Sequence, residues 1–205
     1  MILALLQLAG LLVILSACGD IIRVVPADTP TPAATATPQI GATAEASSDL
    51  PRRIIAESIN LDAPVVEMGW QVSQQGDQFI SEWDMPENEA GWHRNSALPG
   101  QGSNVVISGH NASTGGHVFA ALDDLQLGDE IKLETDQAEM TTYRVVEKNI
   151  IRTFAASTEA EQYLLDVTQP TEREQLTLIT CWPSWTNTHR LIVIAVPAPE
   201  SPPIP

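Results

Sequence analysis

A series of short apolar runs fills residues 52–197 and places the strongest constraint on the fold. The runs are rich in Val, Ile, Leu and Thr, which favour β-strands, and turn signals such as LPGQG at residues 98–102 and LGD at residues 127–129 separate them. The runs are IIAESINL, PVVEMGW, NVVISG, EIKLET, TTYRVVEKNIIR, QLTLITC and RLIVIAV. The pattern predicts a mainly β domain of about seven or eight strands, typical of a closed or nearly closed barrel.

Two stretches in the same region favour short helices. Residues 118–125 follow the pair Gly115-Gly116, and residues 158–165 follow Ser157, a residue type that caps helix N-termini. A domain of about 150 residues buries roughly 68–70% of the surface of its unfolded chain. The predicted domain is therefore long enough to hold a core of its own.

The N-terminus has a different composition. Residues 1–17 are apolar except for Gln7 and Ser16, and the run ends in Leu15-Ser16-Ala17-Cys18, which resembles the lipobox of a bacterial lipoprotein signal. The resemblance implies that Cys18 is lipidated and that the chain is cut just before it. No Lys or Arg precedes the run, and an uncleaved membrane anchor is the alternative. Both interpretations predict an extracytoplasmic protein anchored to the membrane at a bacterial cell surface.

Pro, Thr and Ala dominate the next segment, a composition that buries no core and favours an extended linker. A shorter Pro-rich segment ends the chain. The sequence thus predicts four parts: a signal or anchor at 1–18, a linker at 19–51, a folded domain at 52–197 and a tail at 198–205.

Charge and cysteine content exclude two further features. The formal net charge is −16, from 26 acidic and 10 basic residues, and such a surface repels phosphate backbones, so no nucleic-acid partner is expected. The two cysteines, Cys18 and Cys181, lie on opposite sides of the linker, so we expect no disulfide between them.

Cys181 ends the run QLTLITC and is followed by Trp182-Pro183, where the chain leaves the predicted sheet. A thiol at such a strand end suits a nucleophile held by a rigid scaffold, and a buried structural cysteine is the alternative. Arg190 begins the next strand-like run after eight intervening residues, so a hairpin would bring it close to Cys181. Its cation would favour a thiolate and hydrogen-bond an oxyanion, and a solvated charge at a strand end is the alternative.

His110 ends the run NVVISGH and begins a loop rich in Asn, Ser, Thr and Gly. A histidine that leaves a strand into a polar loop suits a general acid or base. The other histidines fit this role less well, since His93 is expected in a loop, His117 at a helix end and His189 beside Arg190.

Metal binding is another use for such side chains. The residues that would form a zinc site are His110, His117, His189 and Cys181. No pair of them shows a recognisable ligand spacing. Three acidic residues offer oxygen ligands to calcium, but solvated surface charge is the simpler interpretation of Asp123, Asp124 and Asp129. We therefore expect no metal ion and no other cofactor.

Together these residues resemble the sortase family. Thr177-Leu178-Ile179-Thr180-Cys181 matches the TLxTC signature at every fixed position, Arg190 opens the strand RLIVIA that follows it, and Ser108-Gly109-His110 looks like the strand-end histidine of the family. The stretches GWHRNSALPGQGSNVVISGH and GGHVFAALDDLQLGDEI are also similar, and they favour the shorter, housekeeping-like classes (class E or F) without fixing the class. The similarity covers nearly all of residues 52–197.

The resemblance implies a sortase-type closed β-barrel of about eight strands with a few short helices. It implies that Cys181 is the nucleophile, that His110 is the general acid or base, and that Arg190 binds the oxyanion or the substrate. Thr180 would help to position substrate. The reaction would cut a sorting motif of LPxTG type after its Thr, hold the acyl part as a thioester, and pass it to an amine. The implied partners are secreted proteins that carry this motif and an amine acceptor on the cell wall or on another protein.

Two other functions stay open at this stage. L,D-transpeptidases are also exported, β-rich and cysteine-dependent, but their cysteine usually follows Ser-His-Gly, and no such run occurs here. The third interpretation is a tethered binding module that keeps the fold without turnover.

Overall fold

The computed structural model describes residues 22–23, 49–75, 78–111, 116–186 and 188–199. Cys18, the lipobox-like segment and most of the predicted linker lie outside the described residues. Within the described part of the chain, no helix combines the length and the hydrophobicity needed to cross a membrane.

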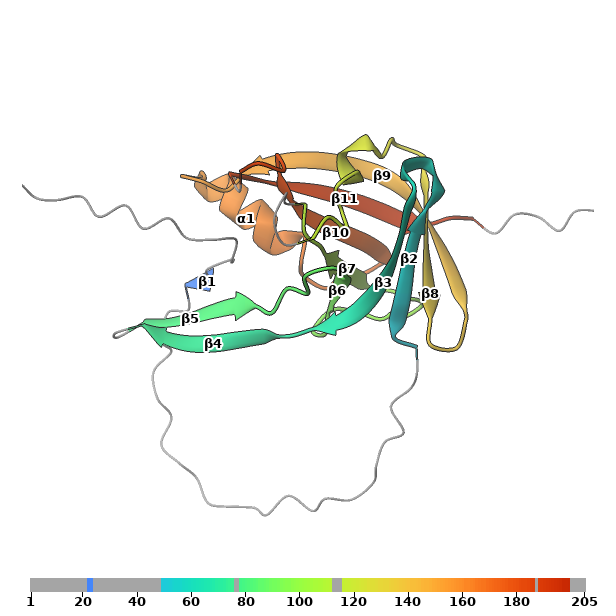
Figure 1. Ribbon diagram of the computed structural model, residues 1–205, viewed down its shortest axis with the longest axis horizontal. Helices are drawn as coiled ribbons and strands as arrows, with labels where there is room; N and C mark the ends of the chain where they lie inside the picture. The colour runs from blue at the N-terminus through green and yellow to red at the C-terminus, as the bar shows by residue number, and fades with distance from the viewer. Residues whose placement is uncertain (1–21, 24–48, 76–77, 112–115, 187, 200–205) are drawn as a thin grey trace, which may run out of the picture.

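The main body is a closed barrel of eight strands, in the order β10-β11-β9-β8-β2-β3-β6-β7 (Figure 1). Neighbouring strands are antiparallel except for the parallel pairs β3–β6 and β7–β10. The strands are β2 (Pro51–Ala56), β3 (Leu61–Met68), β6 (Ala90–His93), β7 (Asn104–Ser108), β8 (Glu130–Thr135), β9 (Met140–Arg152), β10 (Gln175–Trp182) and β11 (His189–Pro197). The mainly β fold and the closed barrel predicted from the sequence are confirmed.

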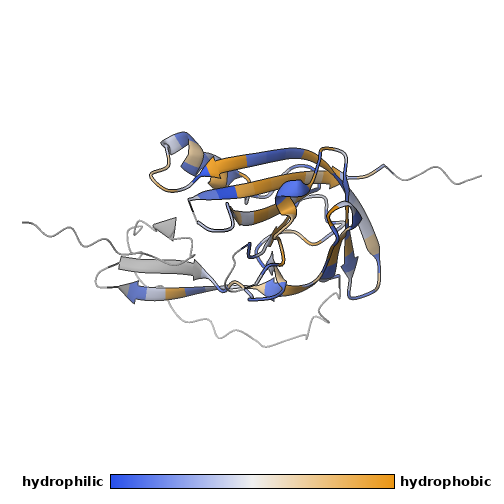
Figure 2. Cartoon of the chain, turned by 45° about the horizontal axis from the view of Figure 1, so that its top comes forward, coloured by the Kyte–Doolittle hydropathy of each residue, from blue (hydrophilic) through white to orange (hydrophobic). Residues whose placement is uncertain are grey.

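The core fills the inside of the barrel. In β10 the inward positions are Leu176 and Leu178, and in β11 they are Leu191, Val193 and Ala195, all fully buried. Full burial of one large aliphatic side chain stabilises a fold by roughly 1.5–3 kcal/mol. Figure 2 shows hydrophobic residues, in orange, along the barrel strands. Because side chains alternate along a strand, this inward set assigns the intervening residues to the outer face.

One of the two predicted helices is confirmed. Helix α1 (Thr158–Asp166) begins after Ser157, whose hydroxyl accepts a hydrogen bond from the Ala160 amide at 3.3 Å. The helix predicted at residues 118–125 is wrong, because the segment forms a turn followed by the 3-10 helix η2 (Leu122–Asp124). Its buried side chains are three residues apart, the repeat of a 3-10 helix, and they are Phe119, Leu122 and Leu125.

Two strand predictions also needed correction. The run IIAESINL is not one strand: β2 ends at Ala56, the 3-10 helix η1 (Glu57–Ile59) follows, and β3 begins at Leu61. The turn between them depends on Asn60 with φ of 53°, a left-handed conformation that Asn tolerates better than most residues. His93 was expected in a loop, but it ends strand β6.

A hairpin of β4 (Trp70–Gln75) and β5 (Gln78–Trp83) runs out from the barrel (Figure 1). A two-residue strand, β1 (Ile22–Arg23), pairs with β5 and completes a three-stranded sheet. Aromatic contacts hold the base of the hairpin: Trp70 and Trp83 meet edge to face at 5.5 Å, and the Arg94 guanidinium lies 4.8 Å from the Trp70 ring.

Candidate active site

Cys181 and Arg190 lie directly opposite each other on adjacent antiparallel strands. Their Cα atoms are register partners, Cys181 near the end of β10 and Arg190 near the start of β11. Such partners point to the same face of a sheet, with Cβ atoms roughly 4.5–5.5 Å apart. The predicted hairpin is therefore confirmed, and because pairing continues to Trp182 and His189, the loop is shortened to residues 183–188.

His110 reaches the same region from the other side of β10. Strands β7 and β10 are parallel, Ile179 is level with Ser108, and the Gly109 amide donates to the Ile179 carbonyl at 3.1 Å. Continuing this register by two residues brings His110 level with Cys181. The three candidate residues thus come to the same end of the barrel from distant parts of the sequence: Cys181 on β10, Arg190 on β11 and His110 two residues beyond the end of β7.

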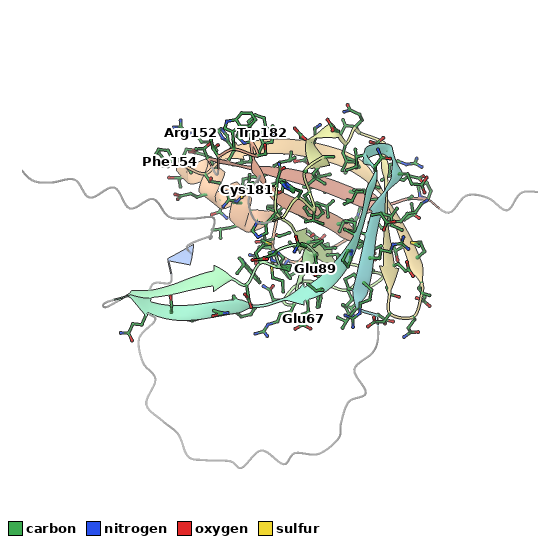
Figure 3. The ribbon with its side chains drawn as sticks, in the orientation of Figure 1. Glu67, Glu89, Arg152, Phe154, Cys181 and Trp182 are labelled. Atoms are coloured by element: carbon green, nitrogen blue, oxygen red, sulfur yellow. The ribbon has the colours of Figure 1, made fainter. Side chains whose placement is uncertain are left out.

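Cys181 and Arg190 lie on the outer face of the barrel wall. Leu178 belongs to the core, so the two-residue repeat of β10 places Cys181 on the opposite face. Cys181, His110 and Arg190 are all partly exposed, and Cys181 carries a reduced thiol. Figure 3 shows Cys181 at the same end of the barrel as Phe154. The candidate site is therefore accessible to solvent, while the paired strands β10 and β11 hold Cys181 and Arg190 in place.

The surroundings of His110 act on its pKa in opposite directions. Burial lowers the pKa of His110 below the ordinary value of 6.5, while the negative charge of Glu87 opposes this shift, and the lowering prevails. The loop after His110 passes close to Glu87 at Gly116, which has φ of +98°, and a Cβ there would lie 1.6 Å from the Glu87 carbonyl oxygen. Gly116 is therefore needed for the loop to come so close.

Thr180 lies on the inner face, opposite the buried Leu191. Its side chain is 2% exposed, and its hydroxyl donates to the Gly109 carbonyl at 2.7 Å. The contact with substrate that the signature implies for Thr180 stays a prediction. The contact that the structure shows is with the strand end that carries His110.

Two of the side chains considered for zinc lie on different faces of the sheet. His189 is the register partner of Trp182 and meets its ring edge to face at 5.7 Å, so it points away from the face of Cys181. Its Nδ1 atom is 2.9 Å from the Thr188 hydroxyl. No group of three or more His, Cys, Asp or Glu in the described ranges is placed to hold a metal ion.

Asp129, one of the acidic residues considered for calcium, has protein partners. Its carboxylate accepts hydrogen bonds from the Ser58 hydroxyl at 2.8 Å and from the Gln126 amide at 3.0 Å. These bonds, the Gln126 amide first, lower the pKa of Asp129. This carboxylate caps a turn before β8.

A small cavity adjoins the strand end that carries Cys181. Its volume is about 100 Å³, and it is lined by Asn111, Ala120, Asp123 and residues 182–185. Exposed aromatic side chains lie at the same end of the barrel, since Trp185 is 78% exposed and Phe154 is 68% exposed. The cavity therefore lies next to Cys181 in the chain, on the side of Trp182, and its lining mixes aromatic side chains with the polar groups of Asn111, Asp123 and Ser184.

Two buried residues, Asn111 and His93, support this region through contacts that were not predicted from the sequence. Asn111 is 4% exposed, and its Nδ2 atom donates to the Cys181 carbonyl at 3.2 Å. His93 is 4% exposed, its Nε2 atom is 2.6 Å from the Ser108 hydroxyl, and its ring lies 4.2 Å from that of Trp83. Only the pairing of strands reveals these contacts, because each joins residues from different elements.

Burial of His93 predicts a pH-dependent stability. Burial lowers the pKa of His93 to about 4, so between pH 6.5 and 4 the unfolded chain binds a proton that the native chain does not. The free energy of unfolding should therefore decrease as the pH is lowered from 6.5 to 4, by about 3 kcal/mol from this group. Denaturant unfolding at several pH values measures it, and the His93→Gln protein should lose this part of the slope. Equal slopes in the two proteins would contradict the prediction.

A closed eight-stranded barrel that brings a cysteine, a histidine and an arginine to one end defines a class of β-barrel proteins with a cysteine-centred candidate site. The family model of the sortase domain matches residues 54–198, and the chain belongs to the sortase family. No match was found among curated protein sequences.

Solved sortase structures resemble this one. A lid mutant of sortase A from Corynebacterium diphtheriae has a TM-score of 0.56 and 26% identity over 75% of this chain and 72% of that one. A sortase D5 transpeptidase from Clostridium perfringens has a TM-score of 0.53 and 26% identity over 73% of this chain and 79% of that one. Sortase C1 from Streptococcus agalactiae has a TM-score of 0.55 and 24% identity over 73% of this chain and 68% of that one, which supports the fold alone.

Proposed function

We propose that this sortase-like protein cuts an LPxTG-type sorting motif after its Thr and transfers the acyl part to an amine. The observation that supports the proposal is the pairing of Cys181 with Arg190 on adjacent strands, with His110 two residues beyond the end of β7 and level with Cys181. A thiol, an imidazole and a guanidinium at one end of a rigid barrel supply a nucleophile, a proton carrier and an oxyanion partner.

In the first half of the reaction, the Cys181 thiolate attacks the Thr carbonyl carbon of the motif. The C=O pair moves onto oxygen, and the Arg190 guanidinium stabilises that negative charge. As the pair returns, the C–N bond breaks and His110 gives a proton to the leaving amine. A thioester on Cys181 and a released C-terminal fragment result.

In the second half, an acceptor amine attacks the thioester carbonyl carbon. His110 takes the proton from this amine, the C–S bond breaks, and a new amide forms while Cys181 leaves as the thiolate. The same imidazole therefore acts first as an acid and then as a base. No cofactor takes part in the proposed sequence, and the partners are a secreted protein bearing the motif and an amine on the cell wall or on another protein.

The test uses the full chain with a panel of LPxTG-like fluorogenic peptides, with and without oligoglycine, followed by mass spectrometry. We expect an adduct of the acyl fragment on Cys181 and an amide product when the amine is present. Peptide binding without an adduct would support a binding module instead. An adduct formed only from a cell-wall stem peptide would support an L,D-transpeptidase-like enzyme.

Arg190→Lys should lower kcat by roughly 10²-fold, because a point charge replaces a planar fork of donors at the oxyanion. Arg152→Lys is the matched control, since Arg152 is exposed at the same end of the barrel on β9 and its register partner is His189 (Figure 3). Its kcat should stay near that of the unmodified protein. A near-normal kcat in Arg190→Lys would show that charge alone suffices.

We further propose that the protein works outside the cytoplasm, at the bacterial cell surface, held through its N-terminus. Cys18 is either the lipidated first residue of the mature protein or part of an uncleaved anchor. The mass of the N-terminal peptide from the membrane-bound protein separates the two. A peptide that begins at a lipidated Cys18 supports the lipobox, and one that begins at Met1 supports the anchor.

A further inference from the structure

The hydrogen bonding between β7 and β10 continues past the last residue of β7. Beyond Ser108, the Gly109 amide donates to Ile179, the Thr180 hydroxyl donates to Gly109, and the Asn111 side-chain amide donates to Cys181. The first of these bonds is ordinary strand pairing. The other two come from side chains, which take over where the backbone of β7 has left the sheet.

Both side chains are almost fully buried. Thr180 is 2% exposed and Asn111 is 4% exposed, and the bonds measure 2.7 Å from Thr180 Oγ1 to the Gly109 oxygen and 3.2 Å from Asn111 Nδ2 to the Cys181 oxygen. A buried polar group that loses its partner is costly, so these bonds persist in the folded state.

His110 is the residue between the two anchored positions. Gly109 before it is bonded to Ile179 and Thr180, and Asn111 after it is bonded to Cys181. The His110 carbonyl also accepts a hydrogen bond from the Phe119 amide at 3.0 Å. The backbone of His110 is therefore fixed on both sides relative to Cys181.

The close packing at Gly109 removes the remaining freedom. A Cβ at Gly109 would lie 2.6 Å from Val118 Cγ1 and 2.7 Å from Phe119 Cδ2, so the chain runs directly beneath these side chains. The anchored segment cannot move toward the loop at residues 116–125 without a clash. On the side of β10 it is held by the Gly109–Ile179 backbone bond and by the pair of side-chain bonds.

We infer that Thr180 and Asn111 are positioning residues, whose side-chain hydrogen bonds hold the His110 imidazole at the distance from the Cys181 thiol that proton transfer needs. This inference rests on the proposed function for its meaning in catalysis. It gives Thr180 a role through His110 rather than through contact with substrate, since its side chain faces the barrel interior and Cys181 faces outward.

A positioning role and a direct contact with substrate predict different kinetics for Thr180→Val, a substitution that keeps the shape of the side chain and removes the hydroxyl. A positioning role predicts that kcat falls by roughly 10- to 100-fold while KM changes little. It also predicts that Thr180→Ser, which keeps the hydroxyl, restores most of kcat. A substrate contact predicts a raised KM with kcat retained.

A second readout requires no peptide. The rate at which iodoacetamide alkylates Cys181 is measured against pH in the full-length protein, because a nearby imidazole changes the pH dependence of a thiol. We expect Thr180→Val and Asn111→Ala to shift this profile toward that of His110→Gln. Identical profiles in the unmodified protein, Thr180→Val and Asn111→Ala would overturn the inference.

Thr177→Val is the matched control for a merely structural loss. Thr177 lies on the same strand, is fully buried, and donates its hydroxyl to Asn104 Oδ1 at 2.8 Å, but it is remote from His110. It should lower Tm as Thr180→Val does, without a shift in the alkylation profile. An equal shift of the alkylation profile in Thr177→Val would show that the shift in Thr180→Val comes from general destabilisation. That result would overturn the inference.

The design separates this inference from the proposed function. If no peptide is turned over but the alkylation profile shifts as expected, the positioning role stands and the proposed reaction fails. If Thr180→Val does not fold, Asn111→Ala carries the test, because it removes the second bond from a loop outside β10. If peptides are turned over and neither variant shifts the profile, the reaction stands and the positioning role fails.

Discussion

Replacing Cys181 with Ala should lower the rate of peptide cleavage by at least about 10⁴-fold, since the variant has no thiol to form the acyl intermediate. The remaining cysteine of the chain, Cys18, belongs to a segment that the linker separates from residues 52–197. Water attacking without covalent catalysis would account for the residual rate. The measurement is the initial rate with the best peptide of the panel, together with mass spectrometry for the thioacyl adduct.

The chain provides its own control for this substitution. Cys18→Ala removes the other cysteine and should leave cleavage of a soluble peptide unchanged. Thermal unfolding should show that Cys181→Ala keeps the fold, because Cys181 is partly exposed and faces away from the core. A normal rate in the Cys181→Ala protein would remove this residue from the mechanism.

The second large effect is expected for His110→Gln, with a loss of about 10³-fold in kcat. General acid and base catalysis by one side chain contributes roughly 10²–10⁴-fold, and here one imidazole would serve both halves of the reaction. Because burial lowers the pKa of His110 below 6.5, its protonated form is scarcer at neutral pH than in an ordinary histidine. The pH limb that His110 controls should therefore lie below pH 6.5 and should vanish in the variant.

The control for His110 is His189→Gln. His189 lies at the same end of the barrel, next to Arg190 in sequence, but on the face opposite to Cys181. The bond from Arg190 Nη1 at 3.3 Å goes to the His189 backbone carbonyl, which the substitution leaves in place. A loss in His189→Gln as large as that in His110→Gln would contradict the assignment.

The sequence allowed the barrel to be predicted because its strands are short runs rich in Val, Ile, Leu and Thr, separated by turn signals. Runs such as NVVISG and RLIVIAV become β7 and β11, and the cysteine and arginine meet because a short loop joins their strands. The extra hairpin β4–β5 escaped prediction because its strands, WQVSQQ and QFISEW, are rich in Gln and Ser. Strand β6 escaped because it is only four residues long.

The relation of His110 to Cys181 could not follow from local sequence. It depends on the parallel pairing of β7 with β10, and neither strand carries a signal that names its partner. For the same reason, the contacts of Asn111 with Cys181 and of His93 with Ser108 became visible only in the folded chain. The family resemblance pointed to the three candidate residues, and the strand register gave their arrangement.

The parallel seam between β7 and β10 also determines when the site comes into existence during folding. The Thr180–Gly109 hydrogen bond across it joins residues 71 positions apart, and contacts between such distant segments form late because a long loop must first be closed. Before this pairing forms, Cys181 on β10 and His110 beyond β7 are not yet brought together. Cys181 and His110 therefore come together only when this pairing closes the barrel, and the proposed site cannot exist in a chain that has not completed it.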